Sequence, residues 1–425
     1  MRQFDKSLLL STFDKVLERQ SRSEARQRVT FVRVEKPKRS VFPILYLPVE
    51  VKARELAAKG VIARQALGAG FNVVIGSAWP LMGWYKSLAP GIILFKTMNA
   101  MDAHNMALWA QHGHFIAALD DEAFGIRATP DYLAATIHPH ASAVADVVCA
   151  QGPAYARAFP FPVSLHVTGN PRALTYSASR GNDILVCLQS GNINNYGRSF
   201  EEMVSKTLGL GQSLQSAEGL AWARILRESI AHECDVLPLV SATIAALAEA
   251  FPDRKVVVRP HPVEDPSIWS FPYSNVIMDK SESVADSLGR AGNVVFVSGC
   301  TTGLDAYLAG VPAVRLGSGG HGISSEMHIS ASTPGDAVEA VRRGERWTGT
   351  ITDHLADLDI INPLMEIHRT NAAVGAAQIA IPTGFEPTEF RKQKFSDTGN
   401  EEIEQLVGRP CQRIAWNTFF ATPGS

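Results

Sequence analysis

The sequence predicts an α/β protein built from two Rossmann-like domains that face a cleft. Short apolar runs alternate along the chain with stretches that carry apolar residues at helical spacing, a pattern typical of βαβ units and a parallel sheet. The alternation stops at a polar segment, Tyr176–Asn182, and then starts again. The chain has 425 residues, which is long for a single hydrophobic core. We therefore expect two domains.

In the first half, short apolar runs bounded by Gly, Pro or polar residues predict strands. These runs are Phe42–Leu47, Asn72–Ile75, Gly91–Phe95, His114–Leu119, Asp146–Cys149 and Leu165–Val167. Helical spacing predicts helices at Val51–Leu67, which Gly68 ends, and at Ala100–Gln111. The first Rossmann-like domain is therefore expected over residues 41–176, after a basic helical extension at residues 1–40.

The second half repeats the pattern. Its expected strands are Ile184–Leu188, Lys255–Val258, Val276–Met278, Val294–Val297 and Ala313–Leu316. Helices are expected over residues 201–251, 302–309, 334–344 and 362–379. These elements predict a second domain over residues 177–380. Residues 381–425 form a polar tail that is either partly disordered or folded back over the first domain.

Composition and charge narrow the class of protein. The formal net charge is −2, so the basic excess of a nucleic-acid-binding protein is absent. The five cysteines form no CxxC pair, which indicates neither a disulfide framework nor a zinc site. No apolar run approaches 18 residues, so a cytoplasmic protein is expected. Residues 1–40 carry an excess of about six positive charges, which fits either a solvated helix or contact with the inner face of the plasma membrane.

Three adjacent carboxylates follow the expected strand His114–Leu119: Asp120, Asp121 and Glu122. Ligands of open parallel sheets bind at the carboxyl ends of the strands. Mutual repulsion among the three groups is expected to raise the pKa of at least one of them, which suits a general base. The alternative is a solvated acidic loop or a helix N-cap.

The segment Arg259-Pro260-His261-Pro262 follows another expected strand. Its prolines stiffen the turn and fix the direction of the imidazole. Arg259 offers a guanidinium fork to phosphate oxygens, and His261 can donate a hydrogen bond to the same group. The alternative is a rigid turn with a capping histidine.

A third candidate segment is rich in small residues and opens a helix. Ser298, Thr301 and Thr302 offer hydroxyl groups where a helix N-terminus favours negative charge. Asp305, one turn further on, is a candidate for ribose hydroxyls. The alternative is ordinary N-capping by a threonine. Glu50 and Arg54, at the start of the first long helix, are weaker candidates.

These motifs resemble the surface carbohydrate biosynthesis protein family. The resemblance spans roughly residues 43–320 and rests on these segments: Leu47-Pro48-Val49-Glu50, Ala53-Arg54-Glu55-Leu56, Leu119-Asp120-Asp121-Glu122, Val167-Thr168-Gly169-Asn170-Pro171-Arg172, Arg259-Pro260-His261-Pro262, Thr301-Thr302-Gly303-Leu304-Asp305-Ala306 and Gly310-Val311-Pro312. The chain is also similar to GT-B enzymes that use CMP-activated sugars, namely capsule Kdo transferases and bacterial sialyltransferases.

The resemblance implies a GT-B fold with the acceptor in the first domain and the donor in the second, and no metal or cofactor. In those transferases an acidic pair followed by Gly supplies the base. The pair matches Asp121 and Glu122, but Ala123 stands at the Gly position. The resemblance further implies that His261 and Pro262 contact the donor phosphate. Ser298, Thr301 and Thr302 match a hydroxyl-rich helix start with the same role.

The expected function is metal-independent transfer of a sugar onto a bacterial surface polysaccharide or glycolipid. The sugar is expected to be Kdo-like or sialic-acid-like, from a CMP donor. Partners are therefore a nucleotide-sugar and a glycan acceptor, with no nucleic acid. Three alternatives stay open: a UDP-GlcNAc 2-epimerase-like enzyme, a CDP-glycerol-type transferase and a non-catalytic GT-B scaffold in polysaccharide assembly.

Overall fold

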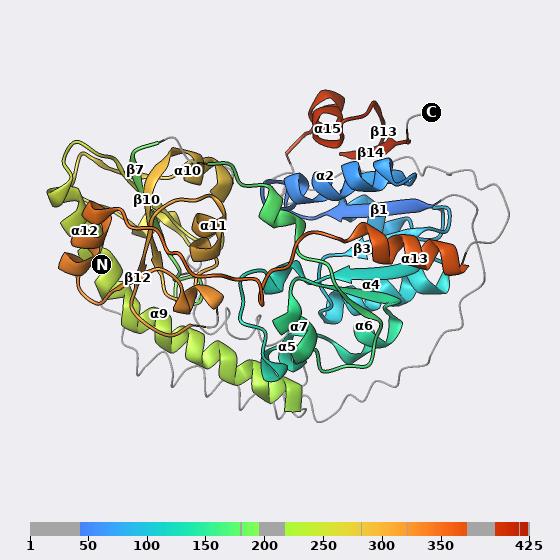
Figure 1. Ribbon diagram of the computed structural model, residues 1–425, viewed down its shortest axis with the longest axis horizontal. Helices are drawn as coiled ribbons and strands as arrows, with labels where there is room; N and C mark the ends of the chain where they lie inside the picture. Colours follow the sequence, from blue (N-terminus) through green and yellow to red (C-terminus); the bar gives the residue numbers. More distant parts are fainter. Residues whose placement is uncertain are drawn as a thin grey trace. The chain divides into compact units, whose positions relative to one another are not determined.

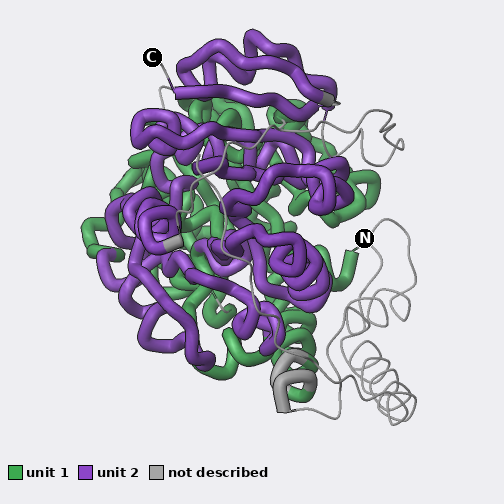
Figure 2. The backbone as a smooth tube through the Cα atoms, turned by 90° about the vertical axis from the view of Figure 1, so that its right-hand side faces the viewer, with its two compact units in different colours: residues 1–28, 125–135, 176–351 green, residues 29–124, 136–175, 352–425 purple. Residues whose placement is uncertain are grey.

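The computed structural model describes residues 43–178, 181–194, 217–281, 283–320, 322–371, 396–415 and 417–423. The chain forms two compact units, coloured separately in Figure 2. Among the described residues, unit 1 contains the segments 125–135 and 176–351, and unit 2 contains the segments up to 124, 136–175 and from 352 onward. The basic segment 1–40 lies outside the described residues.

Unit 2 is built on a mainly parallel sheet with the strand order β13-β14-β2-β1-β3-β4-β5-β6 (Figure 1). Its first six strands are β1 (Ile44–Val49), β2 (Asn72–Ser77), β3 (Ile92–Phe95), β4 (Phe115–Leu119), β5 (Val147–Ala150) and β6 (Leu165–Val167). The connecting helices are α2 (Lys52–Gly68), α3 (Ala78–Gly83), α4 (Ala100–Gln111), η1 (Asp121–Ala123), α6 (Pro139–Val144), α7 (Pro153–Ala158) and η2 (Pro171–Leu174). The parallel order 2-1-3-4-5 is that of flavodoxin-like sheets.

The end of the chain completes unit 2. Helix α13 (Ile361–Asn371), helix α15 (Asn400–Val407) and the hairpin β13 (Cys411–Ala415) and β14 (Thr418–Ala421) all belong to this unit. Strand β14 pairs antiparallel with β2, and a Cβ atom at Gly76 would lie only 2.1 Å from the backbone oxygen of Asn417. The described part of the tail therefore folds back over the first domain, one of the two outcomes expected. Helix α13 lies in unit 2, whereas the sequence places it in the second domain.

Unit 1 contains a fully parallel sheet with the order β12-β11-β10-β7-β8-β9. Its strands are β7 (Asp183–Cys187), β8 (Val256–Arg259), β9 (Val276–Met278), β10 (Ala291–Val297), β11 (Ala313–Leu316) and β12 (Ile329–Ala331). Its helices are α5 (Pro130–Thr136, up to residue 135), α9 (Ala217–Ala250), η3 (Pro266–Ile268), α10 (Val284–Arg290), α11 (Thr302–Leu308), η4 (Ile323–Glu326) and α12 (Pro334–Arg343). Numbered within the unit, the strand order is 3-2-1-4-5-6, that of a dinucleotide-binding Rossmann sheet.

Both faces of the unit 1 sheet are buried. In β7, Ile184 and Val186 belong to one apolar cluster, and Leu185 and Cys187 belong to the cluster on the other face. This alternation follows from the two-residue period of a strand, and burial on both faces explains why the strand reads as a continuous apolar run. The predicted class of two Rossmann-like α/β domains is confirmed.

Helix α9 is the long yellow-green helix of Figure 1. Among the helices that the structure describes, its segment Ala223–Ala250 has the length and the apolar composition that a membrane-spanning helix needs. Many of its apolar residues, such as Leu226, Ile230 and Ile244, are buried in the core of unit 1 against the sheet. Packing within unit 1 therefore accounts for part of the apolar character of α9.

Candidate active site

Each sheet reverses its strand order at one point, and ligands of open α/β sheets bind at the carboxyl ends of the strands beside such a point. In unit 2 the reversal lies between β1 and β3. In unit 1 it lies between β7 and β10. The residues that follow these four strands, and those that follow the adjacent β4 and β8, are therefore the first places to examine.

In unit 2 the reversal point holds a network of charged side chains. Lys96 follows β3, and its Nζ lies 2.6 Å from Glu50, 3.3 Å from Glu55 and 3.5 Å from Glu122. Arg54 contacts Glu122 at 2.8 Å. The predicted residues Glu50, Arg54 and Glu122 are thus brought together, although the sequence analysis missed Lys96. A lysine directly after a buried strand beside the reversal point was the signal that could have identified it.

Glu55 anchors this network to helix α2. Its side chain is 2% exposed and accepts a hydrogen bond from the backbone N–H of Glu50 at 2.7 Å. A carboxylate in the first turn is favoured by the helix dipole and satisfies an N–H group that lacks a helical partner. The start of α2 is therefore fixed beside the ends of β1 and β3.

The three adjacent carboxylates after β4 lie in three different environments. Asp120 is buried and accepts a hydrogen bond from the Tyr155 hydroxyl at 2.9 Å. Asp121 accepts one from Asn170 Nδ2 at 3.2 Å, and its other oxygen lies 3.7 Å from Lys59 Nζ. Glu122, whose side chain is 50% exposed, contacts Arg54 and Lys96. The short η1 turn therefore separates groups that are adjacent in sequence.

These environments set the proton affinities. Burial raises the pKa of Asp120 to about 7, with smaller contributions from the neighbouring carboxylates. Burial also raises the pKa of Asp121, against the opposing effect of Lys59. Burial acts to raise the pKa of Glu122, but the Arg54 and Lys96 charges more than offset it, so this pKa is lowered. Raised pKa values were expected, but desolvation rather than mutual repulsion is their main cause.

In unit 1 the loop after β7 is held by two buried carboxylates. The Ser190 backbone N–H donates to Glu264 at 2.6 Å. Asn192 donates through both its backbone N–H and its side-chain amide to Glu233, at 2.9 and 2.7 Å. Glu233 and Glu264 are 2% and 1% exposed. Sequence reasoning missed this loop, although a small polar segment after a buried strand, Gln189 to Asn192, is a recognisable signal.

The loop after β8 lies directly against the loop after β7. A Cβ atom at Gly191 would lie 2.5 Å from a Val263 methyl group and 3.5 Å from His261 Nδ1. His261 is exposed, as is Pro262 beside it. The Val263 backbone N–H donates to His261 Nδ1 at 3.4 Å, so the neutral ring carries its proton on Nε2. The histidine therefore lies next to the reversal point and can donate from Nε2.

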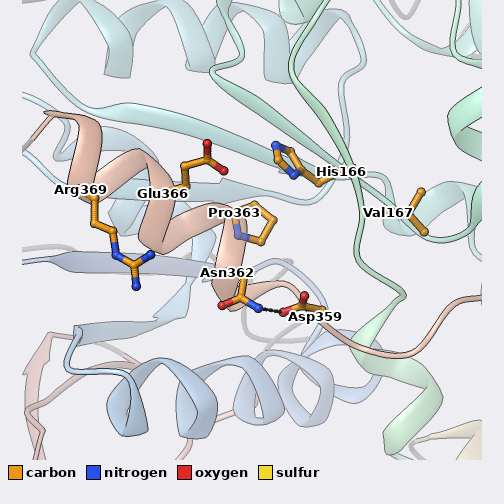
Figure 3. A pocket seen from close by; sticks show the side chains of 7 residues that line it. All are labelled: His166, Val167, Asp359, Asn362, Pro363, Glu366 and Arg369. Atoms are coloured by element: carbon orange, nitrogen blue, oxygen red, sulfur yellow. Dashed lines mark hydrogen bonds between the residues drawn. The ribbon is translucent and has the colours of Figure 1, made fainter.

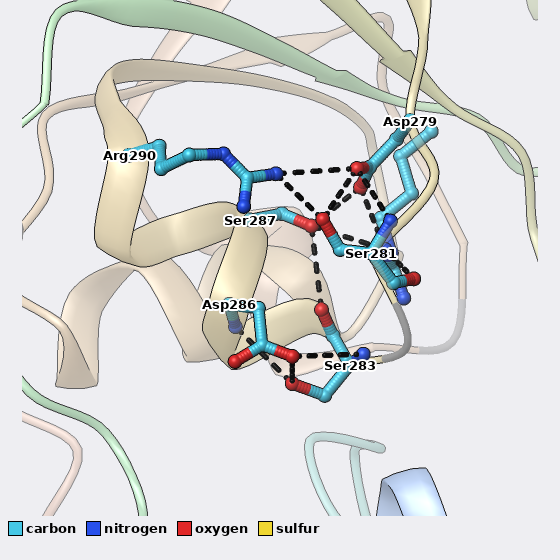
Figure 4. Close-up of polar contacts among 7 residues, drawn as sticks. Asp279, Ser281, Ser283, Asp286, Ser287 and Arg290 are labelled. Carbon is cyan, nitrogen blue, oxygen red and sulfur yellow. Dashed lines mark hydrogen bonds and ion pairs between the residues drawn. The ribbon is translucent and has the colours of Figure 1, made fainter.

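Arg259, predicted to contact phosphate, is engaged elsewhere. Its Nη1 donates to Asp279 at 2.6 Å, to Ser287 at 3.0 Å and to the Ser281 carbonyl oxygen at 3.2 Å. Burial acts to raise the pKa of Asp279, but hydrogen bonds from Ser281, Ser287 and Arg259 lower it to about 2. Figure 4 shows the contacts of Asp279 with Ser281, Ser287 and Arg290. Arg259 therefore links β8 to the residues around the start of α10, and these contacts occupy its guanidinium group.

The third predicted segment, after β10, is largely engaged in internal contacts. The Ser298 hydroxyl donates to the Gly319 carbonyl oxygen at 2.6 Å, and Thr302 accepts from the Cys300 thiol at 3.3 Å. Asp305 is buried and accepts from the Tyr176 hydroxyl. Thr301 is half-buried and occupies the N-cap of α11 without a side-chain cap bond. Of these four side chains, only Thr301 has no hydrogen bond within the described residues that would compete with a ligand.

The glycine-rich segment after β11 packs closely on the turn after β10. A Cβ atom at Gly322 would lie 2.1 Å from the Gly299 carbonyl oxygen, and one at Gly320 would lie 2.7 Å from that of Ser298. Only residues without a side chain permit this approach. The close approach of these glycines therefore lets the two loops pack against each other.

The carboxyl of Glu233 leads to a stability prediction. Burial raises its pKa to about 8, far above the ordinary glutamate value that applies in the unfolded chain. Between those two values the folded state holds a proton that the unfolded state has lost, so stability falls as the pH rises from about 4.5 to 8. The upper bound of this effect is about 5 kcal/mol. Melting curves at pH 5 and pH 8.5 should therefore show a larger loss of Tm for the wild type than for Glu233→Gln.

Glu228, exposed on the same helix, provides the matched control. Glu228→Gln should lose as much Tm between pH 5 and pH 8.5 as the wild type does. An equal pH dependence in the wild type and Glu233→Gln would contradict the prediction.

Unit 2 also contains a surface cavity of about 450 Å³ (Figure 3). It lies between β6 and α13 and is lined by His166, Val167, Asp359, Asn362, Pro363, Glu366 and Arg369. None of these residues was predicted from the sequence. Within the segments that the structure describes, no group of three or more His, Cys, Asp and Glu side chains could hold a metal ion.

Comparison with known proteins gives a likeness to solved structures. The sequence matches no protein-family model and no curated protein. Among solved structures, the chain is similar to the 2.2 Å crystal structure of a presumed UDP-N-acetylglucosamine 2-epimerase from Listeria monocytogenes. The identity is 10% and the TM-score 0.47, over 78% of this chain and 96% of the Listeria chain. At these values the likeness does not identify an activity for this chain.

Proposed function

We propose that the protein is an enzyme that acts on a nucleotide-activated sugar, and that it transfers the sugar to a hydroxyl group of a glycan acceptor. The observation that carries the proposal is Asp121, a carboxylate at the carboxyl end of β4. Its side chain is 18% exposed, its pKa is raised by burial, and Asn170 fixes its orientation. A general base needs this combination of access, proton affinity and fixed direction.

In the proposed reaction, Asp121 accepts the proton of the acceptor hydroxyl. The acceptor oxygen forms a bond to the anomeric carbon of the sugar, and the bond from that carbon to the donor phosphate oxygen breaks. The electron pair leaves with the nucleotide phosphate, to which His261 Nε2–H donates a hydrogen bond. A donor aimed at the group on which charge develops lowers the barrier.

Asp121 is a better candidate for the base than its two neighbours. Asp120 is 8% exposed and already bonded to Tyr155, so an acceptor has little access to it. Glu122 is accessible, but two cations lower its pKa and make it a weak base. The assignment of the nucleotide to unit 1 is supported by the 3-2-1-4-5-6 strand order and the exposed His261 beside its reversal point.

The finer assignment is to a CMP donor carrying a Kdo-like or sialic-acid-like sugar, with a bacterial surface polysaccharide or glycolipid as acceptor. It is supported by the motif resemblance around Asp121, His261 and Thr301. The activity named for the Listeria protein provides a second candidate, epimerisation of UDP-N-acetylglucosamine, which requires no acceptor.

The first experiment is a thermal-shift screen of the purified protein against CMP, CDP, UDP, UDP-GlcNAc and GDP, with and without Mg²⁺. A ligand at 100 times its Kd stabilises by about 2.7 kcal/mol, which raises Tm by several degrees or less in a chain of this size. We expect a shift with CMP that does not depend on Mg²⁺. A shift with UDP-GlcNAc alone would favour the epimerase, and no shift with any nucleotide would contradict both enzyme assignments.

The second experiment separates the two candidates directly. The protein is incubated with the nucleotide-sugar that binds, with and without a mixture of glycan acceptors, and the products are separated by mass spectrometry and NMR. Transfer requires the acceptor and releases the free nucleotide. Epimerisation proceeds without an acceptor and leaves the mass of the nucleotide-sugar unchanged.

A further inference from the structure

Lys59 is a buried cation with an unusual set of contacts. It lies on helix α2, its side chain is 1% exposed, and its Nζ makes no hydrogen bond with any described residue. The nearest acidic oxygen is Asp121 Oδ2, at 3.7 Å. Lysine is almost never fully buried unless it is paired, so this position requires an explanation.

Stability does not explain Lys59. Removing an ammonium group from water costs several kcal/mol, and a loose pair at 3.7 Å without hydrogen bonds recovers little of that cost. The same helix buries Ile62, Ala63 and Ala66 against the core of unit 2. An apolar side chain at position 59 would therefore serve folding at least as well as lysine.

The position of Lys59 relative to Asp121 offers an explanation. Asn170 donates to one oxygen of Asp121, and Lys59 faces the other oxygen from a different element. Glu55 and Arg172 also act on the pKa of Asp121, and they act in opposite directions. Asp120 is coupled to Asp121 as well. Of the charged groups that oppose the effect of burial, Lys59 is the strongest.

We propose that Lys59 is a positioning residue for the reaction proposed above: its buried ammonium group favours the charged form of the partly exposed Asp121 and orients that carboxylate to accept a proton. The inference rests on the proposed function. Asp120 has a hydroxyl donor and no cation among its contacts, whereas Asp121 has both an amide donor and a cation. The absence of a short hydrogen bond to Lys59 leaves Oδ2 able to bond the acceptor hydroxyl.

The test measures Asp121 directly. Protein labelled with ¹³C at the aspartate carboxyl carbons is titrated by NMR, and Asp121→Asn identifies the signal. In Lys59→Met we expect the pKa of Asp121 to rise by about 1 to 3, the usual effect of losing an opposite charge at this distance. Lys59→Arg should return the pKa towards the wild-type value, and Lys59→Gln replaces Lys59→Met if the latter fails to fold.

Lys52 provides the matched control, because it lies on the same helix and pairs with Glu402 instead. Lys52→Met should leave the pKa of Asp121 unchanged. In a turnover assay, the acid limb of the kcat/KM profile of Lys59→Met should move to higher pH by the same amount as the pKa, and Lys59→Arg should reverse the change.

The NMR readout separates the two hypotheses. An unchanged Asp121 pKa in both Lys59→Met and Lys59→Gln would overturn the role of Lys59, whatever the enzyme does. A second outcome is a raised Asp121 pKa in Lys59→Met together with full activity in Asp121→Asn. It would show that Lys59 acts electrostatically on Asp121, but it would refute both the assignment of Asp121 as the base and the role of Lys59 in catalysis.

Discussion

Asp121→Asn is expected to lower kcat for sugar transfer by about 10² to 10⁴-fold while leaving nucleotide affinity unchanged. Asparagine keeps the size of the side chain and the oxygen that accepts from Asn170, but it cannot take a proton from a hydroxyl group. The loss should therefore appear in kcat rather than in KM for the donor. Steady-state kinetics and calorimetric nucleotide titration on the same preparation measure both quantities.

The substitution also removes the carboxylate that lies 3.7 Å from Lys59, so the buried ammonium group is less well compensated and the single variant can be less stable. The double variant Asp121→Asn with Lys59→Met removes both charges and should fold, yet it should be as inactive as the single variant. Asp357→Asn, at an exposed position of unit 2, is the matched control and should be fully active. Activity within threefold of wild type in a folded Asp121→Asn protein would contradict the assignment.

The two neighbouring carboxylates should behave differently. Asp120→Asn retains the Tyr155 contact and replaces a group whose pKa is about 7, so we expect a smaller effect, confined to the pH dependence. Glu122→Gln removes one of the carboxylates that contact Arg54 and loosens the charged network, which should raise KM more than it lowers kcat.

The sequence predicted the central strands well because both sheets are mainly parallel and these strands are buried on both faces. Such strands read as continuous apolar runs between turn residues, and β4 and β10 are clear examples. The C-terminal hairpin had no such signal. Strand β13 carries Gln412 and Arg413, and as an edge strand it needs no continuous apolar run to pair with β14.

The candidate site was predicted only in part, because residues that are adjacent in the sequence can direct their side chains to different places. Asp120 and Asp121 were treated as one group, yet the η1 turn directs them to different partners. The sequence did not show that Arg259 is paired, because its partner Asp279 lies 20 residues away, directly after β9. Lys59 could not have been identified, because a lysine on a long helix is almost always solvent-exposed.

The reversal points, by contrast, could be located only with the strand order known. A run of strands and helices predicts a parallel sheet but not which strands are neighbours. In unit 1, pairing of β7 with β10 brings the Gln189–Asn192 loop beside the Ser298–Thr302 loop, although more than 100 residues separate them. Glu233 and Glu264 were missed for a similar reason, because their partners Asn192 and Ser190 lie 41 and 74 residues away in the sequence.

His261→Ala should lower kcat by about 100-fold or more, since it removes the proposed donor to the departing phosphate. The side chain is exposed, so the Tm of the variant should change little. His261→Gln places an amide N–H near the position of Nε2 and should recover part of the loss, whereas His261→Asn places its amide near Nδ1 and should not.

The control is His104→Ala, which removes an exposed histidine from helix α4 of unit 2 and should leave kcat unchanged. If His261 stabilises the leaving group, the loss of kcat in His261→Ala should depend on the donor. A donor with a better leaving group requires less stabilisation of the developing charge. The loss of kcat should therefore be smaller with such an activated donor. An equal loss with both donors would indicate that His261 binds the nucleotide in the ground state, and wild-type activity in His261→Ala would remove it from the reaction.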